Sequence, residues 1–188
     1  MAKQKNNIVM HSTRGMFGGQ VVFKRRAGKS FVAAPPEVDE NREPTARQQE
    51  LQKRFRTSNA YAAAALKDPD IYNAYLRKAK RGQSAYNVAV RDALIAPSIT
   101  VLTAQGYSGQ PGNLIFIEAI DDFKVTSVKL SIHTADNQLV EEGVATVTGS
   151  GLSWVYTTTQ LNNAVAGSRI TATAIDLPAN ETSLEIIL

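Results

Sequence analysis

The pattern of apolar residues changes at Ala96-Pro97, and this change restricts the fold of the chain more than any other feature. After it, alternating and β-branched runs recur about every dozen residues, separated by turn sequences such as GYSGQPG, ADNQ and TGSG. The runs are ITVLTA, NLIFIEAI, KVTSVKLSIHTA, QLVEEGVATV, LSWVYTTT, SRITATAID and SLEIIL. Seven short strands over about ninety residues are typical of a β-sandwich, in which two sheets enclose one core.

Alternation along the third run predicts which of its side chains face the core. The inward residues are predicted to be Thr126, Val128, Leu130 and Ile132. The outward residues are then Val125, Ser127, Lys129 and Ser131. The only tryptophan, Trp154, is predicted to pack between the two sheets.

Before the change, capping residues mark the starts of three short helices. Thr45 and Gln48 form a capping box, in which each side chain accepts a hydrogen bond from the other's backbone N–H. Asp68 precedes a proline, which suits the first helical position. Ser84 caps a third helix that extends through Ile95. The predicted apolar faces are Leu51, Phe55, Ala62 and Leu66 in the first helix and Tyr86, Val90 and Leu94 in the third.

A β-hairpin is predicted over residues 19–34, because QVVFKRR and KSFVAA are rich in strand-forming residues and flank Ala27-Gly28. Ala27 disfavours a positive φ, so a three-residue turn with Gly28 in the left-handed conformation is expected. Val21 and Phe23 are expected on one face of this hairpin. The letters GKS at its tip do not complete a phosphate-binding loop, since that motif needs a glycine at the position that Phe23 holds.

Net charge divides the chain at the same place as the apolar pattern. Residues 1–96 carry a formal charge of +10 and residues 97–188 a charge of −6, which together give the total of +4. This asymmetry indicates two modules with different partners: the basic module suits nucleic acid or an acidic protein surface, including the acidic half of a neighbouring copy. Ordinary solvated surfaces are the alternative explanation.

Composition excludes several classes of protein. The chain has no cysteine, so disulfides, thiolate metal sites and a cysteine nucleophile are ruled out. No run approaches the roughly 20 apolar residues of a membrane span, and the basic N-terminus lacks an apolar signal segment. We therefore expect a protein of the cytoplasm, or of a particle assembled there.

Two motifs carry a resemblance to a known class of module. AIDDFKVTSVKLSI and, later, ITATAIDLPANET resemble the bacterial immunoglobulin-like modules whose strands read AxDxxxVxxVxxxI and AxDxxGNxS. Ala179 stands where that pattern has glycine, so a different turn is expected there. The resemblance implies adhesion, spacing or assembly rather than catalysis.

The N-terminal half is loosely similar to uncharacterised bacterial and phage-type proteins in which a glycine-rich hairpin precedes a PTxxQ helix, and this likeness implies no function. The predicted chain is therefore α+β, with a flexible leader over residues 1–18 and a basic hairpin and three-helix subdomain over 19–96. An immunoglobulin-like β-sandwich is predicted over 97–188.

Few residues offer chemistry. The two histidines, His11 and His133, have no partner in the sequence pattern, and Asp121 and Asp176 follow strands, where capping and turn roles are favoured over calcium binding. Glu141 and its neighbour are expected to form a solvated patch. We predict no enzyme, catalytic residue, metal site, cofactor or small-molecule substrate.

Two functions remain open. The favoured hypothesis is a structural protein that self-associates through its basic N-terminal segment into a ring, a filament or a virion-like particle. The alternative is a nucleic-acid-binding protein whose basic hairpin and helices contact phosphates. In either case the predicted interaction residues are Val21, Phe23, Lys24, Arg25, Arg26, Lys29, Phe31, Arg77, Lys78, Lys80 and Arg81.

Overall fold

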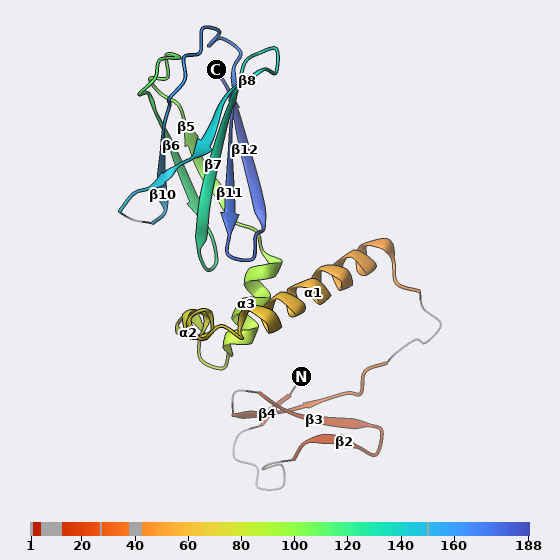
Figure 1. The fold of residues 1–188 in the computed structure, drawn as a ribbon. Coiled ribbons are helices and arrows are strands. Elements are labelled where there is room, and N and C mark those ends of the chain that lie inside the picture. Colours follow the sequence, from red (N-terminus) through yellow and green to blue (C-terminus); the bar gives the residue numbers. More distant parts are fainter. Residues whose placement is uncertain (1, 5–12, 27, 38–42, 150) are drawn as a thin grey trace.

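A computed structural model describes residues 2–4, 13–26, 28–37, 43–149 and 151–188 of the chain. The described part forms three helices and three antiparallel sheets (Figure 1). The predicted α+β class is therefore confirmed. His11 and Ala27, on which two of the sequence interpretations depend, lie outside the described residues.

The first sheet contains the predicted hairpin and two further strands. Its members are β1 (Ala2–Gln4), β2 (Gly15–Phe17), β3 (Val21–Arg26) and β4 (Lys29–Ala33), in the order β1-β4-β3-β2. Gly28 has a φ of +77°, as expected, but the register pairs Arg26 with Lys29, so two residues rather than three connect β3 and β4. Strands β1 and β2 belong to the segment predicted as a leader, which makes the N-terminal sheet larger than the hairpin that the sequence indicated.

The helical segment consists of α1 (Ala46–Ala65), α2 (Pro69–Lys78) and α3 (Ala85–Leu94). All three predicted caps are present: Thr45 and Gln48 form the capping box, Asp68 accepts from backbone N–H groups of α2, and Ser84 accepts from Asn87. The capping residues in the sequence were therefore sufficient to locate the start of each helix. Helix α2 ends at Lys78, so Lys80 and Arg81 follow its last residue.

Only half of the apolar face predicted for α1 is buried. Ala62 is fully buried and Leu66 is partly buried, whereas Leu51 and Phe55 are 53% and 55% exposed. The reason is length: α1 has 20 residues and its partner α3 has 10, so α3 can cover about half of it at about 1.5 Å per residue. In α3 the buried side chains are Ala85, Ala89, Val90 and, unexpectedly, Asp92.

Residues 98–188 form what we term the two-sheet unit. Its strands are β5 (Ser98–Thr103), β6 (Leu114–Ile120), β7 (Val125–His133), β8 (Leu139–Val144), β9 (Thr146–Val147), β10 (Ser153–Thr157), β11 (Arg169–Asp176) and β12 (Glu181–Ile187). The run QLVEEGVATV supplies both β8 and β9, which lie in different sheets, so seven predicted runs give eight strands. The sheets have the orders β5-β6-β10-β9 and β12-β11-β7-β8.

The two sheets share one core: buried side chains alternate with exposed ones along β6 and with partly buried ones along β11. Trp154 belongs to this core, as predicted. In β7 the predicted inward residues Val128, Leu130 and Ile132 are buried, but Thr126 is exposed and Val125 is buried. A register shift opposite Ile175 and Asp176 adds one residue to β7 and reverses the alternation at its start.

Candidate interaction surface

The N-terminal sheet has two faces, and none of its described side chains is buried. Residues paired across antiparallel strands share a face, so the register assigns each side chain. One face, the Phe23 face, is made of Phe17, Val21, Phe23, Arg25, Ser30 and Val32. The opposite face, the Phe31 face, is made of Met16, Val22, Lys24, Arg26, Lys29, Phe31 and Ala33. Over the described side chains of β2, β3 and β4, the sheet therefore has no core of its own.

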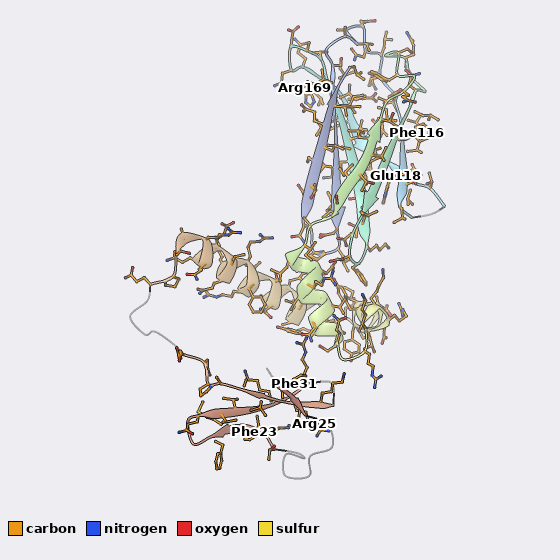
Figure 2. The ribbon with its side chains drawn as sticks, turned by 180° about the vertical axis from the view of Figure 1, so that it is seen from behind. Phe23, Arg25, Phe31, Phe116, Glu118 and Arg169 are labelled. Carbon is orange, nitrogen blue, oxygen red and sulfur yellow. The ribbon has the colours of Figure 1, made fainter. Side chains whose placement is uncertain are left out.

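Predicted interaction residues of the hairpin gather around one hollow. A surface pocket of about 640 Å³ is lined by Arg14, Phe23, Lys24, Arg25, Arg26 and Phe31. Figure 2 shows Phe23 and Phe31 on opposite sides of the sheet. The sequence did not single out Arg14, which joins this group because β2 pairs with β3.

The basic run after α2 does not join the hairpin. Lys78 and Lys80 line a separate hollow of about 180 Å³ with Arg91 and Phe123, and the Lys78 ammonium lies 5.9 Å from the centre of the Phe123 ring. Arg77 and Arg81 are exposed on the helical segment. The structure therefore divides the predicted interaction residues between two places.

The GKS sequence occupies a hairpin and not a phosphate loop. Gly28 lies in the turn, and Lys29 and Ser30 are the first residues of strand β4. Strand β4 continues from Ser30 to Ala33, so a strand and not a helix N-terminus follows the GKS letters.

The outer side of β6 was missed by the sequence interpretation. Ile115, Ile117 and Ala119 of this strand are buried, and the alternate side chains point outward. We term the β6 face the outer side of β5, β6 and β10 around Glu118. Its apolar residues are Val101, Leu114, Phe116, Ile120 and Val155, and the register places Ser153 and Thr103 on the same side. The run NLIFIEAI contained the signal, because a strand that is apolar on both faces indicates a covered outer face.

A buried polar network joins the helical segment to the two-sheet unit. The Tyr75 hydroxyl donates to Asp92 Oδ2 across 2.5 Å and lies 3.0 Å from the Tyr61 hydroxyl. The rings of Tyr75 and Phe123 pack with their centres 4.2 Å apart. Phe123 and Leu177, from two loops of the two-sheet unit, complete the small core of the helices.

Three carboxyl groups meet at this junction. Burial of Asp92 raises its pKa to about 7; the hydrogen bond from Tyr75 opposes this effect, and the charges of Asp121 and Asp176 add to it. Asp92 Oδ1 and Asp121 Oδ1 are both buried without a hydrogen-bond partner among the described residues. The two carboxyl groups lie close enough for the charge of Asp121 to raise the pKa of Asp92.

Asp121 and Asp176 have the turn roles that were favoured. Asp121 Oδ2 accepts from the backbone N–H groups of Phe123 and Lys124, each at 2.9 Å. Asp176 accepts from the backbone and side-chain N–H groups of Asn180. Among the residues that the structure describes, no group of three or more His, Asp or Glu side chains could hold a metal ion.

Glu141 is a correction, because it is buried and not part of a solvated patch. It extends from β8 and its Oε2 accepts from the Tyr156 hydroxyl at 3.2 Å and from the Thr159 N–H at 2.8 Å. Burial and the neighbouring Glu141 carboxylate raise the pKa of Tyr156 to about 12. Glu142, on the other side of β8, is exposed as expected.

Comparison with known proteins assigns no family. No protein-family description matches the chain, and no curated protein is significantly similar to it. Over the described ranges, no helix is both long and apolar enough to cross a membrane.

Proposed function

We propose that the protein is a non-catalytic assembly component that self-associates through its N-terminal sheet, with an immunoglobulin-like two-sheet unit as the spacer or adhesive module. The observation that carries this proposal is the absence of buried side chains among the described residues of the N-terminal sheet. Phe17 and Met16 are 74% and 59% exposed. Apolar side chains on a sheet over which the described residues place no second layer mark a surface that another chain covers.

Charge supports a second copy as the partner. Residues 1–96 carry +10 and residues 97–188 carry −6, so the N-terminal sheet of one copy is attracted to the two-sheet unit of the next. Contact between unlike surfaces of identical chains is head-to-tail and produces rings or filaments. The buried junction at Asp92 and Phe123 holds the helices to the two-sheet unit, which suits a spacer between successive contacts.

Removal of residues 1–36 tests the proposal. The full chain is expected to sediment as particles much larger than 20.4 kDa, and the shortened chain as a folded monomer. The two-sheet unit and the helices keep their own cores in the shortened chain, so a loss of assembly would report on the N-terminal sheet. Equal sedimentation of both chains would contradict the proposal.

Nucleic acid is the partner to exclude, because Arg14, Lys24, Arg25 and Arg26 surround the pocket on the N-terminal sheet. A gel-shift titration at two salt concentrations separates the two functions. If the protein is an assembly component, its affinity for nucleic acid is expected to be negligible at physiological salt. Tight binding that weakens when Arg25, Arg26 and Lys29 are replaced by Ala, with the salt slope falling by about one per residue, would favour the nucleic-acid function instead.

A further inference from the structure

The β6 face is an uncovered apolar surface on the outside of the two-sheet unit. Phe116 is 46% exposed and Leu114 and Ile120 are each 44% exposed, although all three lie in the interior of a sheet flanked by β5 and β10. Phe116 pairs with Val155 on one side and Thr103 on the other. Figure 1 shows no helix over this sheet. Contiguous exposed apolar side chains of this kind mark protein interaction sites.

Glu118 gives this face its only charge. It pairs with Val101 of β5 and Ser153 of β10, so it stands inside the apolar surface and not at its rim. Figure 2 labels it beside Phe116 on the same strand. A carboxylate at the centre of an apolar surface requires a cationic partner when that surface is covered.

The Phe23 face of the N-terminal sheet has the complementary pattern. Phe17, Val21, Phe23 and Val32 supply apolar surface, and Arg25 is its only charged residue within β2, β3 and β4. Arg25 lies two residues after Phe23 on β3, and Glu118 likewise lies two residues after Phe116 on β6. Two flat sheet faces can pack about 10 Å apart, as in a sandwich, and this pattern would align the aromatic rings and the two opposite charges.

We propose that the β6 face receives the Phe23 face of a second copy of this chain, with Arg25 of one copy paired with Glu118 of the next. This inference rests on the proposed function and names the surface that the N-terminal sheet contacts. In Figure 1 the helices separate the N-terminal sheet from the two-sheet unit, an arrangement that leaves both faces open to other copies.

The outer face of the other sheet is a poorer acceptor. Its groove, of about 410 Å³, is lined mainly by polar side chains, among them Ser131, Glu142, Thr171, Thr173 and Glu181. It offers charge but little apolar surface to cover Phe17 and Phe23. Hydrophobic burial is the main favourable term in most protein association, so the β6 face is preferred.

A charge swap in the full-length chain tests the contact. Arg25→Glu and Glu118→Arg are each expected to raise the concentration needed for half-association at least about tenfold, because each places like charges together. The double variant Arg25→Glu/Glu118→Arg is expected to return within about threefold of the natural chain. Sedimentation velocity measures the association, and circular dichroism verifies that each variant is folded.

Two substitutions on the other sheet serve as controls, one for Glu118→Arg and one for Phe116→Ser, which removes the aromatic ring of the β6 face. Glu142→Arg makes the same charge change on an exposed strand residue and is expected to leave association unchanged. Phe116→Ser is expected to weaken association about tenfold. Val144→Ser, which removes another exposed apolar side chain from β8, is expected to have no such effect.

The outcomes separate this inference from the proposed function. If deletion of residues 1–36 abolishes assembly but Glu118→Arg and Phe116→Ser do not weaken it, the β6 face is not the acceptor and the proposed function stands. If Glu142→Arg weakens assembly and Glu118→Arg does not, the acceptor is the acidic face and the inference is overturned. A full-length chain that is monomeric throughout would overturn both.

Discussion

Tyr75 donates its hydroxyl proton to Asp92 Oδ2 across 2.5 Å, in the buried junction between the helices and the two-sheet unit. The other carboxyl oxygen of Asp92 is buried and has no hydrogen-bond donor among the described residues. Asn180 adds a hydrogen bond of 3.3 Å from its side chain to the backbone oxygen of Asp92. The junction is therefore held by a carboxyl group that is most stable when protonated.

Replacement of Asp92 by Asn is expected to remove a pH dependence of stability. Burial raises the pKa of Asp92 from 3.8 to about 7, so between these values the folded chain binds a proton that the unfolded chain has lost. The natural chain is thus expected to lose stability as the pH rises from about 4 to about 7. In Asp92→Asn the amide can accept from Tyr75 and donate to Asp121 at any pH. Melting temperatures at pH 5 and pH 8 measure the difference.

The control for this experiment is Asp122→Asn, which neutralises the exposed partner of Arg91 in the same loop region. It is expected to keep the full pH dependence of the natural chain. The raised pKa of Asp176 contributes in the same direction, so a smaller slope is expected to remain in Asp92→Asn. An unchanged slope in Asp92→Asn would contradict the raised pKa of Asp92.

Ala179→Gly is expected to stabilise the protein by about 1 kcal/mol, since Ala179 occupies the left-handed region that glycine adopts at little cost. Its φ is 68°, in the turn between β11 and β12 where Asp176 accepts from Asn180. Chemical denaturation measures the change. Ala96→Gly is the control: this residue has no positive φ, so the substitution is expected to be neutral or destabilising. Similar effects at both positions would contradict the strain argument.

Glu141→Ala is expected to lower the free energy of unfolding by about 2 kcal/mol, because the buried Tyr156 hydroxyl and the backbone N–H groups of Thr159 and Gln160 lose a charged acceptor. These donors lie on β10 and the following loop, whereas Glu141 lies on β8 of the other sheet. Urea denaturation measures the loss. The exposed neighbour gives the control: Glu142→Ala is expected to change stability by less than about 0.5 kcal/mol. Equal losses would mean that the buried hydrogen bonds contribute nothing.

The fragment of residues 97–188 is expected to fold cooperatively with a β-type circular dichroism spectrum, since its core is formed by its own two sheets. It is expected to be less stable than a chain that includes the helices, by about 2 kcal/mol, because Phe123 and Leu177 lose their cover. Thermal melting of the two chains measures this. A gradual, non-cooperative transition of the fragment would contradict the boundary at Ala96-Pro97.

Local signals in the sequence predicted the elements of the fold well. Thr45, Asp68 and Ser84 begin the helices because capping depends on a few neighbouring residues, and alternation located the strands because burial on one face has a period of two. Pairing between distant segments was not accessible in the same way. Three features depend on such pairing. They are the register shift at Asp176 that exposes Thr126, the burial of Asp92 beside two loops of the two-sheet unit, and the hydrogen bonds of Glu141 to the other sheet.

The candidate surface was predicted in part. Composition identified the basic hairpin, and the structure brings Phe23, Arg25 and Phe31 to one pocket. Composition could not show that Arg77 and Arg81 lie on the helical segment, apart from the hairpin, because their position depends on how α2 packs against α3. The sequence NLIFIEAI could indicate the β6 face only once the inner and outer sides of that strand were known.

Light scattering of the full-length protein tests whether the chain self-associates. At high protein concentration and low salt, we expect particles much larger than 20.4 kDa. Their mass is expected to fall as salt is added, because exposed charges such as Arg25 and Glu118 are screened beyond about 8 to 10 Å. A mass of 20.4 kDa at every concentration and salt level would contradict self-association and leave an external partner as the explanation for the uncovered N-terminal sheet.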